Sequence, residues 1–156
     1  MRNNKRSFQM DFETRVKLHI YRVIAETTWM PSSLEVAQAL KCSVEEVEAA
    51  FQGLYQKRLL VLEPGSASKI RMAPPFSGIE TPFLVEVEGK SYYANCAWDA
   101  LGIPAALHQD GDIRASDGLT GEAMSLQVRD GNPVPQECVI HFAVPAARWW
   151  DDIIYT

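Results

Sequence analysis

Apolar residues recur at helical spacing near the start of the chain, where Val16, Ile20, Val23 and Ile24 fall within residues 12–27. This spacing predicts an amphipathic helix over that range, because positions three and four apart share one helix face. It is the first of several regular elements that the pattern of the sequence predicts.

Two further helices are predicted from their capping signals. Ser32 precedes Glu35, and Ser43 precedes Glu46, at the spacing of a capping box. The pattern predicts helices over 34–40 and from 44 to about 57, with Ser32 or Ser33 as the cap of the earlier one. Residues 59–63 and 69–72 read as two strands around a Pro-Gly-Ser turn. Three helices followed by such a hairpin predict a winged helix-turn-helix over residues 1–73.

The expected recognition helix is poorly suited to DNA. Its first residues, Val44–Glu48, include three glutamates, whereas Arg and Lys dominate contacts to phosphates. DNA is therefore not the expected partner, and we favour a structural or a dimerising winged helix; the dimerising alternative would make the protein a homodimer.

Residues 73–78 read as a linker rich in proline and glycine. Beyond it, strand-like runs alternate with turns at 83–87, 91–93, 112–115, 124–128 and 138–142, with one short helix near 96–106. The first two runs flank Glu88-Gly89-Lys90, which predicts a hairpin. The second domain, 74–156, is therefore a small, mostly antiparallel sheet, and the fold class is α+β.

The composition is that of a globular protein, with 47% hydrophobic and 22% charged residues and a formal net charge of −5. The negative charge argues against nucleic acid as the main partner. The chain shows no signal peptide, and no apolar run is long enough to span a membrane. Three cysteines at irregular spacing predict neither a disulfide framework nor a zinc site. We expect a cytoplasmic location.

Cys96 and Asp99 are the most informative pair in the sequence. Three residues apart at the start of the short helix, they share one face of a turn. A thiolate is a soft metal ligand and a carboxyl group carries protons, so the pair suits chemistry on a thiophilic metal. Helix-start N–H groups favour anions, which predicts a lowered pKa for the Cys96 thiol. The alternative is a small buried cysteine beside a helix-capping aspartate.

Other candidates have simpler interpretations. The histidines His19, His108 and His141 have no partner at ligand spacing and are interpreted as structural, with His141 on a strand. The Trp149-Trp150 pair either covers a pocket or closes the core, and we favour the core.

The second part of the chain resembles the organomercurial lyase (alkylmercury lyase) family. The resemblance rests on residues 81–83, 93–101 with Pro104-Ala105, 120–126 and 142–145, and the predicted winged helix also fits the family. It implies cleavage of a carbon–mercury bond by protonolysis, without a resident cofactor and with mercury as substrate and product ion. Cys96 would capture the metal as its thiolate, and Asp99 would carry a proton to the leaving carbon. Cys96 and Asp99 are both expected at the metal.

The family uses a second cysteine, and the segment that precedes it resembles Trp149–Thr156, where this chain ends. Neither Cys42 nor Cys138 matches that position. We therefore expect a C-terminally truncated domain with weak or absent turnover. One hypothesis is that codon 157 is a UGA that the host decodes as selenocysteine.

The expected partners are an organomercurial small molecule and external thiols or a mercury-accepting protein. The rival hypothesis is a protein that is not an enzyme and uses its thiol to sequester or sense mercury or another soft metal.

Overall fold

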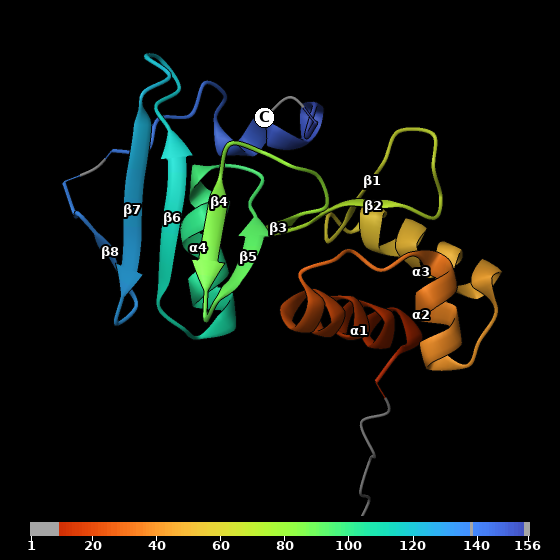
Figure 1. Ribbon diagram of the computed structural model, residues 1–156. Helices are drawn as coiled ribbons and strands as arrows, with labels where there is room; N and C mark the ends of the chain where they lie inside the picture. Colours follow the sequence, from red (N-terminus) through yellow and green to blue (C-terminus); the bar gives the residue numbers. More distant parts are fainter. Residues whose placement is uncertain (1–9, 138, 155–156) are drawn as a thin grey trace, which may run out of the picture.

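The computed structural model describes residues 10–137 and 139–154 of the chain (Figure 1). The helices are α1 (Phe12–Thr27), α2 (Ser33–Leu40), α3 (Val44–Gln56), α4 (Ala97–Leu107) and the 3-10 helix η1 (Ala146–Asp151). The strands are β1 (Val61–Leu62), β2 (Ile70–Ala73), β3 (Phe76–Ser77), β4 (Leu84–Val87), β5 (Lys90–Tyr93), β6 (Gly111–Ser116), β7 (Ala123–Arg129) and β8 (Asn132–Val134). Helices that precede antiparallel sheets confirm the α+β class.

The helix starts follow the predicted capping signals. Ser32 and Ser43 are the N-caps of α2 and α3, and both capping boxes form in full. Each box satisfies donors that a helix end would otherwise leave free. The apolar stripe of α1 is buried as its spacing predicts, with Val16, Ile20 and Ile24 facing the core.

A small sheet of β1, β2 and β3 follows the helices in antiparallel order. The predicted linker over 73–78 is wrong, because β3 lies within it and pairs with β2. Ala73 and Phe76 are buried there, so the segment is part of the packed structure. The division into domains at residue 73 and the name winged helix stay predictions.

The larger sheet has the order β5-β4-β6-β7-β8, with every neighbouring pair antiparallel. The predicted β4–β5 hairpin forms around Glu88 and Gly89, whose φ angles of 50° and 76° are both positive. Two such residues match the twist of the flanking strands in a two-residue turn. Helix α4 covers one face of this sheet (Figure 1).

The strand predicted at 138–142 is wrong for the residues that the structure describes. Residues 139–142 form no strand, and Cys138 lies outside the described residues. Instead β7 pairs with β8 through a two-residue turn at Asp130 and Gly131, where φ is again positive. β8 pairs with the edge of β7, and residues 139–154 lie outside the sheet.

One cluster of buried side chains extends from the helices through both sheets to α4. Aromatic rings connect its two ends, since Tyr21 of α1 contacts Phe76 and Phe76 contacts Tyr92 of β5. The Tyr92 hydroxyl also donates to the Ala25 carbonyl oxygen at 2.9 Å. Within the described residues, none of the helices is both long and apolar enough to cross a bilayer.

Candidate functional site

The segment between β5 and α4 is held in place by the chain on either side of it. Ala94 forms an isolated bridge with Phe76, its N–H donates to the Phe83 carbonyl oxygen, and its own carbonyl oxygen accepts from Thr81 at 2.6 Å. Cys96 then serves as the extended N-cap residue of α4, with φ −155°. The start of α4 is therefore fixed, and with it the place of the Cys96 thiol.

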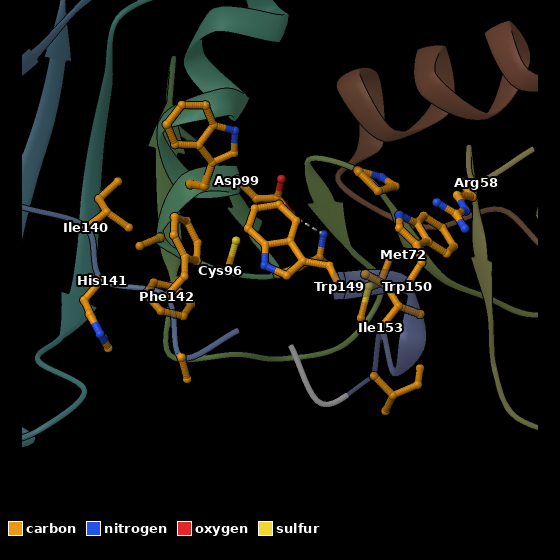
Figure 2. Close-up of a pocket in the computed structure, with 17 residues that line it drawn as sticks. Arg58, Met72, Cys96, Asp99, Ile140, His141, Phe142, Trp149, Trp150 and Ile153 are labelled. Atoms are coloured by element: carbon orange, nitrogen blue, oxygen red, sulfur yellow. Dashed lines mark hydrogen bonds between the residues drawn. The ribbon is translucent and has the colours of Figure 1, made fainter. Parts of the chain in front are cut away.

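A pocket of about 640 Å³ opens beside this helix start (Figure 2). Cys96 and Asp99 both line it, so the structure brings the two predicted site residues together. The other residues that line it are Arg58, Met72, Pro74, Phe83, Asn95, Ala97, Trp98, Ile140, His141, Phe142, Ala143, Trp149, Trp150, Ile153 and Ile154. The lining combines many apolar and aromatic side chains with a few polar groups, as small-molecule sites do.

The C-terminal segment, residues 139–154, supplies one wall of the pocket. The rings of Phe142 and Trp149 lie 5.0 Å apart, and the Trp149 Nε1–H donates to the Val144 carbonyl oxygen at 2.8 Å. The Arg58 guanidinium carbon lies over the Trp150 ring, 5.7 Å from the centre of that ring. The interpretation that the tryptophan pair closes the core is wrong, because both are half-buried and line the pocket.

Asp99 is half-buried, and its carboxylate Oδ2 accepts from Asn95 Nδ2 at 2.8 Å. Burial raises the pKa of the Asp99 carboxyl group above its ordinary value, and the Asn95 hydrogen bond opposes this change. Burial, with the nearby Asp99 charge as a smaller cause, also raises the pKa of Tyr21 to about 12. The Tyr21 hydroxyl therefore stays neutral and donates to the Pro74 carbonyl oxygen at 2.7 Å.

The prediction of a lowered pKa for Cys96 is wrong. Burial raises the pKa of the Cys96 thiol, and the Asp99 charge acts in the same direction. The backbone N–H groups of Trp98 and Asp99 lower it, but by less than burial raises it. The helix start is present as expected, and desolvation outweighs its effect. The Cys96 thiol therefore holds its proton more tightly than an exposed cysteine does.

The remaining candidate residues either lie away from the pocket or belong to no metal-binding cluster. The Cys42 thiol faces the Ala37 carbonyl oxygen at 3.9 Å among the helices, away from the pocket. His141 lines the pocket but is exposed and lies on no strand. In the part of the chain that the structure describes, no three His, Cys, Asp or Glu residues form a metal-binding group.

The sequence model of the alkylmercury lyase family matches residues 76–156, slightly more than half of the chain. This chain belongs to the alkylmercury lyase family. The matched segment contains both Cys96 and Asp99 and most of the pocket lining. The resemblance inferred from the sequence is thereby confirmed.

A solved structure of similar fold is the mercury-bound form of MerB2, with a TM-score of 0.62 and 23% sequence identity. The similarity covers 80% of this chain and 60% of that chain, so the present chain spans about three-fifths of the length of that structure. At this identity the likeness shows the fold alone. No curated protein matches the chain.

Some pocket residues escaped the sequence analysis. Asn95 adjoins Cys96, and its bond to Asp99 follows the i, i+4 spacing of a helix turn, which is a usable signal. Arg58 lies in the turn after α3, far from the rest of the pocket in sequence, and no local pattern connects it to the pocket.

Proposed function

We propose that this alkylmercury lyase family member cleaves a carbon–mercury bond by protonolysis, with Cys96 capturing the metal and Asp99 carrying the proton. The observation that supports this most is that the thiol and the carboxyl group line one pocket in the segment that matches the family. The neighbouring structure is described as mercury-bound, which agrees with a soft-metal substrate.

The capture step exchanges a proton for a mercury–sulfur bond. An organomercury cation RHg⁺ binds the Cys96 sulfur, and the thiol proton passes to the Asp99 carboxylate. Because burial raises the pKa of Asp99, this group holds a proton more readily than an exposed aspartate does. The strong mercury–sulfur bond drives a proton transfer that the raised pKa of Cys96 would otherwise oppose.

The cleavage step requires a second electron-rich ligand on mercury. A second thiolate increases the electron density on carbon, and the proton held by Asp99 then forms the new carbon–hydrogen bond as the carbon–mercury bond breaks. The overall balance is RHg⁺ + 2 R′SH → RH + Hg(SR′)₂ + H⁺. Within the described residues, Cys96 is the thiol that lines the pocket, and the assay therefore includes an excess of small thiol as a source of the second sulfur.

The organic group R would lie against the aromatic side of the pocket, between α4 and the C-terminal segment. The pocket lining includes the aromatic residues Phe83, Trp98, Phe142, Trp149 and Trp150. A flat ring can stack on such side chains, whereas a methyl group leaves most of a pocket of about 640 Å³ unfilled. An arylmercury compound is therefore the probe substrate of choice.

The test separates mercury capture from hydrocarbon release. Protein is mixed with phenylmercury and excess small thiol, bound mercury is measured by native mass spectrometry and benzene by headspace gas chromatography. We expect Cys96→Ser to lose both and Asp99→Asn to keep capture but lose benzene. Cys42→Ser is the matched control and should retain both.

Two results would contradict the proposal. Capture that survives in Cys96→Ser would exclude the assigned thiol. Stoichiometric capture without any benzene from the unaltered protein would favour the rival function, thiol-based mercury binding or sensing.

A further inference from the structure

Asn95 is a polar residue in hydrogen-bond contact with the proposed proton carrier. Its Nδ2 donates to Asp99 Oδ2 at 2.8 Å, a bond drawn as a dashed line in Figure 2. Asn95 lines the pocket together with Cys96 and Asp99. It is thus the neighbour that can decide how the Asp99 carboxyl group is oriented.

The orientation of the Asn95 amide is itself fixed. Its Nδ2 lies 3.4 Å from the carbonyl oxygens of Pro75 and Phe76 as well as near Asp99. A flipped amide would place Oδ1 against these two oxygens, which can only accept hydrogen bonds. Backbone on the β3 side therefore keeps the donor end toward the carboxyl group.

The other end of the same amide is unused. Asn95 Oδ1 is buried and has no hydrogen-bond partner in the described part of the chain. A buried acceptor without a donor is costly, and native proteins seldom retain one without a reason. The reason offered by this geometry is the bond to Asp99.

We propose that Asn95 is a positioning residue that holds Asp99 Oδ2 as a permanent hydrogen-bond acceptor, so that the transferred proton is carried on Oδ1. The carbonyl oxygen of a protonated carboxyl group is a better acceptor than its hydroxyl oxygen, so the bond from Nδ2 to Oδ2 favours a proton on the other oxygen. The hydrogen bond from Asn95 to Asp99 is present in the protein without mercury, so its effect on Asp99 can be measured without mercury. Their use in proton delivery rests on the proposed function.

The titration of Asp99 reports directly on the hydrogen bond from Asn95. Tyr21 faces it from α1 and stays neutral, Cys96 shares its helix start, and Arg58 and His141 line the same pocket. The bond from Asn95 favours the charged carboxylate and so opposes the effect of burial. Removing the donor therefore moves the Asp99 midpoint to higher pH.

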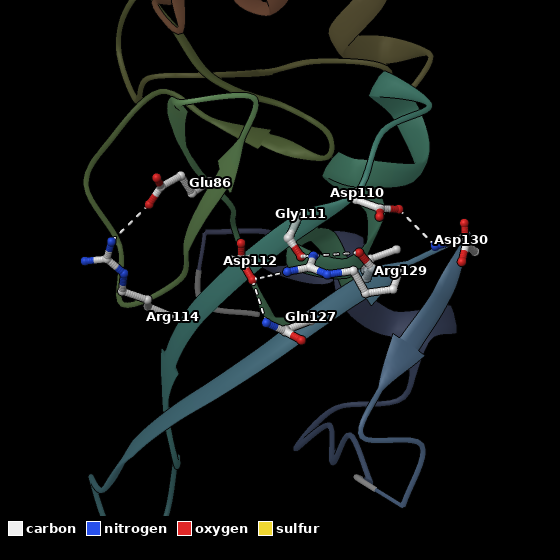
Figure 3. A network of polar contacts seen from close by, with 9 residues as sticks. Glu86, Asp110, Gly111, Asp112, Arg114, Gln127, Arg129 and Asp130 are labelled. Carbon is white, nitrogen blue, oxygen red and sulfur yellow. Dashed lines mark hydrogen bonds and ion pairs between the residues drawn. The ribbon is translucent and has the colours of Figure 1, made fainter.

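Two variants remove the donor in different ways. Asn95→Leu keeps the size of the side chain without any polar atom, and Asn95→Asp keeps its shape but replaces the donor with an acceptor. The matched control is Gln127→Met. Gln127 Nε2 also donates to a carboxylate, Asp112 Oδ1, at 2.8 Å, but on the exposed face of the β6–β7 pair (Figure 3).

The experiment follows the Asp99 side-chain carbon by ¹³C NMR across pH in the full chain, with the resonance assigned by Asp99→Asn. We expect a higher midpoint in both Asn95 variants and an unchanged one in Gln127→Met. With phenylmercury, benzene release by the Asn95 variants at pH 7 should fall by about 10- to 100-fold, since misplaced catalytic groups cost this much.

An unchanged midpoint in folded Asn95→Leu and Asn95→Asp would overturn the positioning role, whatever the activity. An unaltered protein that makes no benzene would instead contradict the proposed function. In that case the titration still decides the role of Asn95, because it needs no mercury.

Discussion

Replacing Asp99 by asparagine should stabilise the protein at neutral pH while removing its proposed chemistry. Burial raises the pKa of Asp99, which means that the folded state disfavours the charged carboxylate. Asparagine has the same shape, carries no charge and can still accept the hydrogen bond from Asn95 Nδ2, which is 2.8 Å long. The substitution therefore removes an unfavourable charge and keeps the contact.

The expected gain is about 1 kcal/mol, within the range of about 0.5–2 kcal/mol that such substitutions commonly give. For a chain of this length, 1 kcal/mol corresponds to a rise in Tm of about 2–4 °C. Active-site residues often cost stability in this way, because function requires an environment that folding alone would not select.

The gain in stability from Asp99→Asn should be present at neutral pH and absent at low pH. A carboxyl group whose pKa is higher in the folded state binds its proton more tightly there, so it is not destabilising at low pH. Below its ordinary value of 3.8, Asp99 is neutral in both the folded and the unfolded state. As the pH rises through the folded pKa, the cost of the charge appears in full. The Tm difference between the variant and the unaltered protein should therefore be present at pH 7 and absent near pH 3.5.

Thermal unfolding followed by circular dichroism at both pH values measures this difference. The matched control is Asp112→Asn, since hydrogen bonds from Arg129 and Gln127 lower the pKa of the exposed Asp112. That substitution should lower the Tm at pH 7. A lower Tm for Asp99→Asn at pH 7, or an equal gain at both pH values, would refute the reasoning.

Three further predictions concern the pocket and the contact between α4 and the sheet. The Asp99 charge raises the pKa of Cys96, so alkylation of Cys96 by iodoacetamide at pH 8 should be faster in Asp99→Asn than in the unaltered protein, as mass spectrometry would show. Trp149→Ala removes an aromatic wall of the pocket and should raise the KM for phenylmercury about tenfold while changing that for methylmercury less. Gly111→Ala should cost about 1–3 kcal/mol in urea unfolding, because its added Cβ would lie 2.7 Å from Pro104 Cγ.

The elements with strong local signals could be predicted from the sequence. The spacing of apolar residues placed α1, and the two capping boxes placed the starts of α2 and α3. The β4–β5 hairpin followed from its turn residues. Cys96 and Asp99 could be paired because they are three residues apart, a separation at which local geometry decides their proximity.

The predictions that were wrong concern features that depend on distant contacts or on burial. Residues 139–142 form no strand although the sequence predicts one at 138–142, and the edge of β7 pairs with β8 instead, a long-range pairing that local propensity does not reveal. The raised pKa of Cys96 follows from how deeply the folded chain buries it. Trp149 and Trp150 line the same pocket as Cys96 and Asp99, although the two pairs are about fifty residues apart in the sequence. Only the three-dimensional structure supplies these facts.

The most direct test of the central proposal is the fate of phenylmercury in D₂O. The protein is incubated with phenylmercury and excess small thiol, and the benzene is analysed by mass spectrometry. Protonolysis at Cys96 and Asp99 predicts one monodeuterated benzene for each mercury captured, and none from Asp99→Asn. Mercury bound without any benzene, or equal benzene from Asp99→Asn, would contradict it.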